Sequence, residues 1–244
     1  LRRLGAQRLD HVVPDRFNMG YGLSRPLVYL AVSRGAQVLV TVDSGIASVD
    51  GVAYARAQGL IVIITDHHLA GPELPAADAI VNPNQPGDGF PSKHLAGVGV
   101  AFYVMAALRS ELRRRGQTGD ELRMADLLDL VALGTVADVV KLDHNNRILV
   151  AQGLARIRAG RACAGIRALL TAGGRDPAHT TSMDLGFVVG PRLNAAGRLE
   201  DMGQGVACLL CDEEEQALGM ARALDALNRA RRDIEGDMLS GADD

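Results

Sequence analysis

The sequence has little of what marks several common classes of protein. Its 244 residues contain no tryptophan and only 3% aromatic residues, which argues against an array of aromatic rings that stacks on bases. Its formal net charge is −3, so any site for a polyanion must be a local cluster and not a general basic field. No apolar run reaches the length of about 18 residues that a membrane-spanning helix needs, and no secretory signal pattern is recognisable.

Cysteine is also scarce. The three cysteines are too few for a disulfide framework, and they favour a reducing, cytoplasmic environment. Cys208 and Cys211 have C-x-x-C spacing, but with Cys163 as the one remaining thiol a four-thiolate zinc site is excluded. Hydrophobic residues make up 48% of the chain, which is enough for the core of one large domain or two small ones.

Continuous apolar runs alternate with helical patterns in the first part of the chain. This alternation predicts an α/β fold with an open, mainly parallel sheet and helices on both faces. After a stretch rich in Pro and Gly at 82–99, the pattern predicts a helical subdomain. Strands are predicted at 9–13, 37–43, 60–66 and 79–82, and helices at 24–34, 48–59, 98–115, 123–137, 145–159, 163–172 and 212–238.

Two of the predicted strands end on an aspartate. Asp43 closes "QVLVTVD" and Asp66 closes "LIVIITD". Neighbouring parallel strands end at one edge of a sheet, and ligands of open α/β sheets bind outside that edge. Each aspartate could instead cap the helix that follows, and for Asp43 alone the two readings are about equally good.

The residues after Asp66 favour a metal site. His67 and His68 add imidazole to a carboxylate, a ligand mixture that suits Mn²⁺, Zn²⁺ or Fe²⁺. Asp138 interrupts an apolar predicted helix, where a lone buried carboxylate needs a partner. Asp43, His67 and Asp138 therefore form a candidate ligand set. Gly97 and Gly99, before an apolar helix, could cradle a phosphate or allow that helix to pack closely on the sheet.

Several motifs resemble those of a known family. "VTVDSGI", "ITDHH" and "GTVADVV" occur in the order seen in the DHH phosphoesterase superfamily. The stretches "VPDRFNMGYGLS", "IVNPNQPGDGFPSKHLAGVGVAFYV" and "GPRLNAAGRLEDM" are similar to the RecJ family within it, from about residue 13 to residue 232. The resemblance implies a DHH-type fold and a single-stranded-DNA-specific 5′→3′ exonuclease of recombination and repair that uses two Mn²⁺ or Mg²⁺ ions.

The resemblance also implies roles for individual residues. Asp43 would bridge two metal ions, of which His67 and Asp138 would bind one. His68 would face the scissile phosphate, and Asp66 would orient the histidine pair. The phosphate-binding residues would be Arg16, which holds the 5′ phosphate, and Arg192, Asn194 and Arg198 in a "GPRLNAAGR" loop. Besides single-stranded DNA, the implied partners are a single-stranded-DNA-binding protein and a RecQ-type helicase, and no membrane.

One family motif is missing. The aspartate-rich D-x-D turn expected after a first strand does not occur anywhere in the chain, which starts at Leu1 without a methionine. We therefore expect a fragment of the catalytic lobe that is nearly inactive alone. The expected division is an α/β catalytic domain at 1–140, a helical part of the same lobe at 141–211, and at 212–244 the start of a linker to an absent nucleic-acid-binding domain. The alternatives are a DHH phosphoesterase for small phosphate or short oligonucleotide substrates and a catalytically silent replication scaffold.

Overall fold

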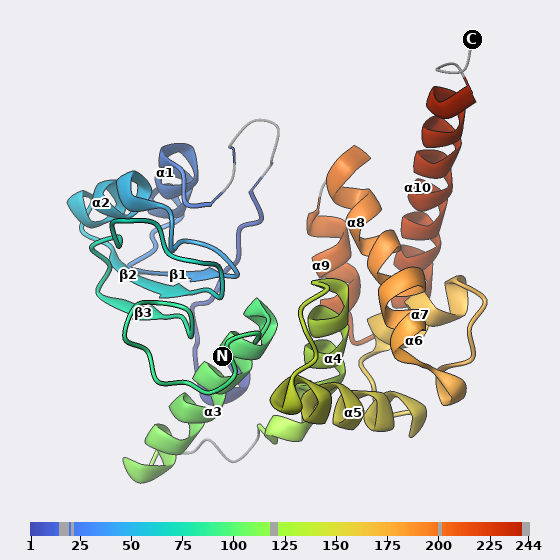
Figure 1. Ribbon diagram of the computed structural model, residues 1–244, viewed down its shortest axis with the longest axis horizontal. Helices are drawn as coiled ribbons and strands as arrows, with labels where there is room; N and C mark the ends of the chain where they lie inside the picture. The colour runs from blue at the N-terminus through green and yellow to red at the C-terminus, as the bar shows by residue number, and fades with distance from the viewer. Residues whose placement is uncertain (15–19, 21, 118–121, 200–201, 241–244) are drawn as a thin grey trace. The chain divides into compact units, whose positions relative to one another are not determined.

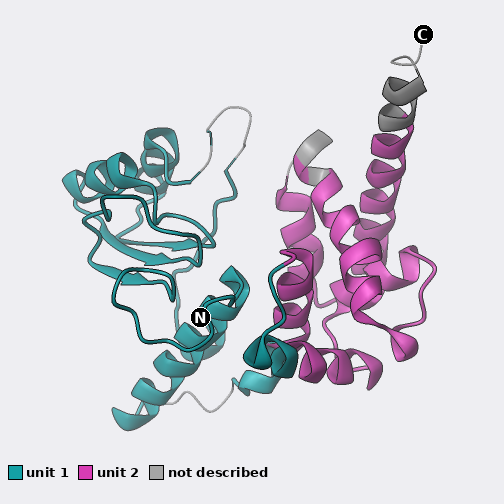
Figure 2. Ribbon diagram, in the orientation of Figure 1, with its two compact units in different colours: residues 1–127, 140–149 teal, residues 128–139, 150–244 magenta. Residues whose placement is uncertain are grey.

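The protein divides into two compact units, which Figure 2 colours separately. The computed structural model describes residues 1–14, 20, 22–117, 122–199 and 202–240, without the side chains of 196, 198, 199 and 234–240. The first unit comprises residues 1–127 and 140–149, and the second comprises residues 128–139 and 150–244. Within the described residues no helix is both long and apolar enough to cross a membrane.

The first unit contains a three-stranded parallel sheet in the order β1-β2-β3 (Figure 1). Helices α1 and α2 lie on one face of the sheet, and α3 lies on the other (Figure 1). The elements of this unit are η1 (Arg2–Leu4), α1 (Arg25–Ser33), β1 (Val38–Val42), α2 (Val49–Ala57), β2 (Ile61–Thr65), β3 (Ala79–Val81), α3 (Gly97–Arg114) and η2 (Met124–Leu127). The predicted open parallel sheet with helices on both faces is confirmed.

Alternate residues of the strands explain why the helices cover them. Val62 and Ile64 of β2 are fully buried with Val28 of α1 and Val52 of α2 in one apolar cluster. Every second side chain of a strand points to the same face, so Val62 and Ile64 both face α1 and α2. The apolar runs in the sequence therefore position the strand ends that carry the functional residues.

The second unit is built from helices. α5 (His144–Arg158) begins in the first unit and continues in the second. The other elements are α4 (Leu128–Ala137), α6 (Ala164–Ala172), η3 (Pro177–His179), α7 (Ser182–Asp184), the π-helical turn η4 (Leu185–Val189), α8 (Gly190–Leu199), α9 (Gly203–Leu210) and α10 (Glu214–Ser240).

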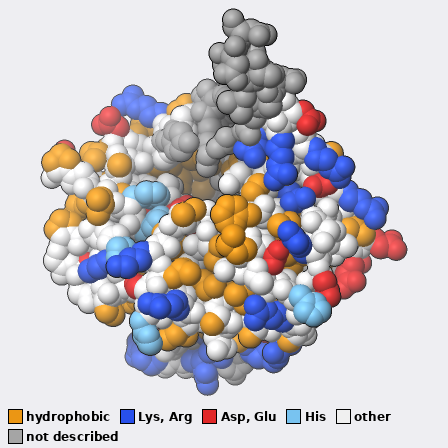
Figure 3. Space-filling view, turned by 45° about the vertical axis from the view of Figure 1, so that its right-hand side comes forward, with side chains coloured by type: hydrophobic (Ala, Val, Ile, Leu, Met, Phe, Trp, Pro, Cys, Tyr) orange, Lys and Arg blue, Asp and Glu red, His pale blue; other side chains and the backbone are white. Residues whose placement is uncertain are grey.

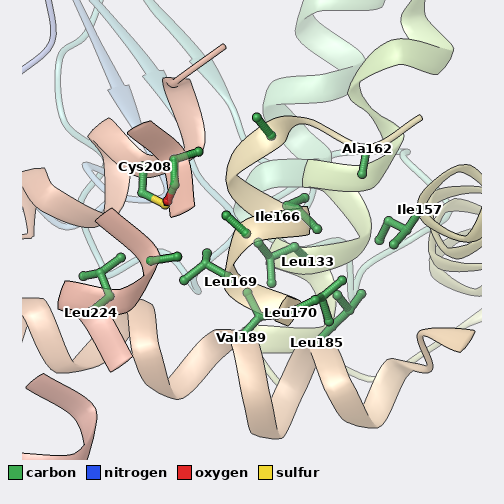
Figure 4. Packing of buried hydrophobic residues seen from close by; sticks show 14 of the residues in the cluster. Leu133, Ile157, Ala162, Ile166, Leu169, Leu170, Leu185, Val189, Cys208 and Leu224 are labelled. Carbon is green, nitrogen blue, oxygen red and sulfur yellow. The ribbon is translucent and has the colours of Figure 1, made fainter. Parts of the chain in front are cut away.

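A single apolar cluster holds these helices together (Figure 4). Leu169 and Leu170 of α6 lie in its middle with Leu185 and Val189 of η4, and all four are fully buried. Helix α10 contributes buried residues at helical spacing, which gives it one apolar face against α6. The predicted helical subdomain is confirmed.

Two sequence predictions of secondary structure are wrong. Residues 9–13 form no strand, although the structure describes all of them. The "GPRLNAAGR" segment is not a loop, because residues 190–198 lie in helix α8, which continues directly from the π-helical turn. Pro191 has no N–H to donate, and it follows the π-helical turn directly, where the regular i→i−4 hydrogen bonds are already interrupted.

Candidate metal centre

The three parallel strands end side by side. Val42 of β1 is opposite Thr65 of β2, and Thr65 is opposite Val81 of β3. The ladder runs one residue further, because the Asp43 N–H donates to the Thr65 carbonyl at 2.9 Å and the Asp66 N–H donates to the Val81 carbonyl at 3.1 Å. The prediction that Asp43 and Asp66 meet at one sheet edge is therefore confirmed.

Asp43 has an unusual backbone conformation. Its φ is 60°, in the left-handed region that non-glycine residues rarely adopt. Its exposed carboxylate reaches His67, with Oδ1 3.1 Å from Nε2. Strained residues are enriched in functional sites, which favours a functional role for Asp43 over that of a helix cap.

Helix α3 begins directly against the Asp43 side chain. A Cβ atom on Gly97 would lie 2.2 Å from Asp43 Oδ1, so only glycine fits at this position. A Cβ atom on Gly99 would instead meet Leu95 of the same segment. Close packing of α3 on the sheet edge, one of the two readings of this Gly-Val-Gly sequence, therefore accounts for Gly97, whereas Gly99 makes room for Leu95 in the segment before α3.

Asp66 is the buried centre of the histidine segment. Its carboxylate accepts hydrogen bonds from the backbone N–H groups of Ile46 (2.9 Å), His67 (2.7 Å) and His68 (3.1 Å), and it contacts the His68 Nδ1 at 2.7 Å. Burial by itself raises the pKa of Asp66, but the hydrogen bonds from Ile46 and His68 bring the pKa below its usual value. Asp66 is therefore a carboxylate acceptor that holds both histidines in place.

The contact with Asp66 also determines the role of each nitrogen of His68. Because a carboxylate is an acceptor, the Nδ1 atom of His68 carries the proton and Nε2 is left for a metal ion or a substrate. The His68 side chain is 60% exposed, whereas the His67 side chain is only 11% exposed. The edge therefore offers a buried imidazole nitrogen from His67 and an accessible imidazole ring from His68.

Asp43, His67 and His68 fit a divalent metal ion. Each offers one ligand atom, and these three atoms lie within 4.8 Å of one another. Ligands at about 2.0–2.3 Å from one ion are separated by about 3–4.5 Å, so small side-chain movements suffice to close the set. A carboxylate with two imidazoles is a donor set for Mn²⁺ or a similar ion.

Sequence reasoning missed two asparagines at this edge. Asn82 is the residue that follows β3, next in the row after Asp43 and Asp66, and its amide donates to the His68 carbonyl at 2.9 Å. Asn84 donates to the His67 carbonyl at 2.6 Å. The sequence signal was present, because the predicted strand at 79–82 also ends on a polar residue.

Asp138 belongs to the second unit, and the prediction that its carboxylate is buried is wrong, although the predicted helix end at residue 137 is confirmed. Helix α4 ends at Ala137, and Asp138 lies in the turn that follows, where it is exposed. Val139 continues the turn with a φ of 59°, a strained conformation for a β-branched residue. The left-handed turn ends the helix before Asp138, so the carboxylate is not taken into the helical core.

The predicted phosphate-binding residues have different surroundings. Arg192 on α8 donates to the Val188 carbonyl at 2.7 Å, and its Nη2 lies 2.7 Å from Oδ1 of the buried Asp225. Asn194 is exposed on the same helix. Arg16 lies outside the described residues, and so does the side chain of Arg198. Arg192 therefore supports the α8–α10 packing through Asp225.

The surface carries its charges in mixed groups. Figure 3 shows a face on which Lys and Arg side chains gather close to Asp and Glu side chains. Arginine forks bind phosphate where they are unpaired, whereas pairing with carboxylates reduces the local positive field. This distribution agrees with the small net charge and favours local phosphate contacts over a broad basic surface.

Residues 1–135 match the family described as DHH family, N-terminal domain. Among curated proteins, the chain is 57% identical over 242 residues to the single-stranded-DNA-specific exonuclease RecJ of Escherichia coli strain K12. It is 41% identical over 242 residues to the protein of that name from Bacillus subtilis strain 168. These alignments cover 98% and 99% of this chain but only 42% and 29% of the relatives. The chain thus spans less than half the length of the curated relatives it matches.

Solved structures give the same picture. The fold is similar to a crystal structure of exonuclease RecJ bound to manganese, with a TM-score of 0.80 and 33% identity over 94% of this chain and 56% of that one. It is also similar to RecJ from Thermus thermophilus in complex with Mn²⁺, with a TM-score of 0.73 and 32% identity over 88% of this chain and 31% of that one. A further structure of the Thermus protein contains Mg²⁺.

Proposed function

The chain belongs to the DHH family, and on this premise we propose that it is the metal-binding part of a nuclease that hydrolyses single-stranded DNA from the 5′ end. The relatives named as single-stranded-DNA-specific exonucleases support the substrate class. The metal ions in related structures support Mn²⁺ or Mg²⁺ as the cofactor. The proposed role in the cell is DNA recombination and repair.

The observation that carries the proposal is the Asp43–His67–His68 cluster at the carboxyl edge of the sheet. A structural role alone does not explain it. An exposed aspartate in a strained conformation, 3.1 Å from an imidazole, contributes little to folding stability. The same three groups are well suited to hold a divalent cation.

Each residue of the site has a separate role in the proposed reaction. Asp43 and His67 would hold the ion, and Asp66 keeps the His68 ring oriented through Nδ1. When bound, Mn²⁺ or Mg²⁺ supplies Lewis-acid stabilisation of the charge that develops on the phosphate oxygens during hydrolysis. With Nδ1 protonated, the Nε2 lone pair of His68 can bind the ion, and when Nε2 also carries a proton it can donate to an oxygen of the scissile phosphate.

The remaining assignments are part of the same proposal. Asp138 would be a further metal ligand, and its exposure in a strained turn supports an interaction outside its own helix. Asn194, exposed on α8, and Arg198 would contact the DNA backbone, and Arg16 would hold the 5′ phosphate. Arg192 would act mainly through Asp225 in positioning α8.

We place the protein in the cytoplasm, because its three cysteines are free thiols. A single-stranded-DNA-binding protein and a RecQ-type helicase are the proposed protein partners. Both supply or protect single strands, which is the substrate form that the proposed activity consumes.

The test is a graft. The region of the Escherichia coli relative that aligns with this chain is replaced by the chain, so that the relative supplies the parts that this chain does not cover. Nucleotide release is measured with Mn²⁺ on 5′-phosphorylated single strands, on duplexes and on pyrophosphate. We expect release from single strands that Asp43→Asn abolishes, and little release from the ungrafted chain.

Two results would contradict the proposal. Release that persists in the Asp43→Asn graft would remove the metal cluster from the reaction. Preferential hydrolysis of pyrophosphate or of very short oligonucleotides would favour a small-substrate phosphoesterase instead.

A further inference from the structure

The two histidines lie where the backbone has no regular partners. Strand β2 ends at Thr65, so the peptide groups of His67 and His68 extend beyond the sheet. Backbone N–H and C=O groups that leave a sheet in a partly buried place need hydrogen bonds from elsewhere. The Asp66 carboxylate supplies acceptors for both N–H groups, at 2.7 and 3.1 Å.

The two carbonyl groups are held by Asn82 and Asn84. The Asn82 amide donates to the His68 carbonyl at 2.9 Å, and the Asn84 amide donates to the His67 carbonyl at 2.6 Å. Each histidine thus has both its N–H and its C=O held, and the peptide group that joins them is fixed on both sides by Asn84 and Asp66. Because the Cα–Cβ direction follows the peptide planes, the direction of each imidazole is fixed with them.

The asparagine pair can make these contacts in only one orientation. The Asn82 Oδ1 accepts a hydrogen bond from the Asn84 N–H at 2.8 Å, which leaves Nδ2 as the donor to His68. If the Asn82 amide were flipped, Oδ1 would face the His68 carbonyl oxygen and Nδ2 would face the Asn84 N–H, and both hydrogen bonds would be lost. Pro83 between them restricts the backbone, and its own carbonyl accepts a hydrogen bond from the Lys93 ammonium group at 2.6 Å.

We infer that Asn82 and Asn84 are positioning residues of the metal centre, which set the direction of the His67 and His68 side chains by holding their carbonyl groups. The inference rests on the metal site of the proposed function. Asn82 is 1% exposed, so it acts from behind the site and does not touch the ion or the substrate. Groups of this kind affect metal affinity by about 10–100-fold in other metal sites.

The variants are Asn84→Ala and Asn82→Ala, with Gln85→Ala as a matched control. The Gln85 amide also donates to a backbone carbonyl, that of Ile80 at 3.2 Å, from the same loop. Each variant therefore loses a hydrogen bond from an amide to a carbonyl, but only the asparagines hold the histidines. Mn²⁺ affinity of the chain is measured by titration calorimetry, and thermal unfolding of the metal-free chain is measured in parallel.

We expect both asparagine variants to bind Mn²⁺ about 10–100-fold more weakly and Gln85→Ala to change affinity by no more than about twofold, although all three lower the melting temperature. Asn84→Asp serves as a second variant, because it keeps the shape and removes the donor. Its added negative charge would strengthen cation binding, so a loss of affinity would come from the missing N–H donor.

Unchanged Mn²⁺ affinity in folded asparagine variants would overturn the inference and leave the proposed nuclease standing. Equal losses in the asparagine variants and in Gln85→Ala would do the same, because the effect would then be general to the loop. If the unaltered chain binds no Mn²⁺, the inference falls together with the metal site. If affinity falls as expected but the graft hydrolyses no DNA, the positioning role stands and the proposed function fails.

Discussion

Replacing Gly97 by alanine should damage the metal centre more than it damages the fold. The added Cβ atom would lie 2.2 Å from Asp43 Oδ1, 2.6 Å from Cγ and 2.8 Å from Cβ. Non-bonded heavy atoms come to rest at about 3.5–4.0 Å, so the carboxylate must move by about 1 Å or more. That movement separates Asp43 from His67, with which it now makes a 3.1 Å contact.

The effect on stability should be small. Alanine is favoured over glycine in a helix by up to about 1 kcal/mol, whereas an overpacked site costs about 1–3 kcal/mol. The two terms partly cancel, which leaves a loss of about 0–3 kcal/mol. Rotation about χ1 can turn the exposed carboxylate away, but the Asp43 Cβ atom moves only with the backbone, so the end of β1 or the start of α3 must also shift slightly. A misplacement of about 1 Å at a ligand should nevertheless weaken Mn²⁺ binding by at least about 10-fold.

Gly99→Ala is the matched control in the same turn of α3. Its Cβ atom would lie 2.4 Å from the Leu95 Cδ1 atom and does not meet Asp43. Both variants are compared by titration calorimetry with Mn²⁺ and by urea denaturation. If Gly97→Ala binds Mn²⁺ as tightly as the unaltered chain, or if Gly99→Ala loses as much affinity, the argument that glycine makes room for the ligand is refuted.

Three further predictions concern the two units separately. Asp66→Asn should lower the free energy of unfolding by about 1–3 kcal/mol in urea, because one amide oxygen cannot replace a carboxylate that accepts from both Ile46 and His68; an unchanged midpoint would contradict this. Burial raises the pKa of Asp225, but hydrogen bonds from Arg229 and Arg192 bring it below its usual value. The stability that Asp225 adds is therefore complete above the unfolded pKa of about 3.9 and is lost as the pH falls through the lower folded pKa. The melting temperatures of the unaltered chain and Asp225→Asn should accordingly converge as the pH falls below about 4, and a constant difference would refute the linkage. Leu169→Ala should cost about 2–5 kcal/mol by denaturation, because Leu169 is fully buried in the helical core, and a loss below about 1 kcal/mol would exclude that core as the main source of stability.

The strands of the sheet and the positions where they end could be predicted from the apolar pattern of the sequence. The runs that became β1 and β2 carry apolar residues on both faces, although Val38, Val40 and Val42 on one face of β1 are exposed, and the aspartate that ends each run identifies the strand end. The metal centre followed from these ends, since parallel strands finish at a common edge. The histidines next to Asp66 needed no tertiary information.

Errors arose where local and tertiary preferences differ. The usual signal for the end of a helix is a glycine in the left-handed conformation, but at the end of α4 it is Val139 that adopts it. The predicted helix end at residue 137 matches the end of α4, but without such a glycine nothing in the sequence indicates that the chain turns outward there and leaves Asp138 exposed. In α8 the glycines and Pro191 resemble a loop, and the helix forms because it continues from η4 and packs against α10. Such contacts between distant segments leave no local pattern.

The left-handed conformation of Asp43 explains why aspartate occupies the end of β1. A non-glycine residue in this region costs about 1–2 kcal/mol, and the carboxylate recovers about 0.3–1 kcal/mol by lying at the amino end of α3, where the backbone N–H groups favour negative charge. Glycine would remove the strain but would offer no ligand. Asparagine tolerates the conformation but lacks the charge that attracts a cation and a helix end. Aspartate combines tolerance of the conformation with a carboxylate that turns out of the strand toward His67, which is the arrangement that the proposed metal site requires.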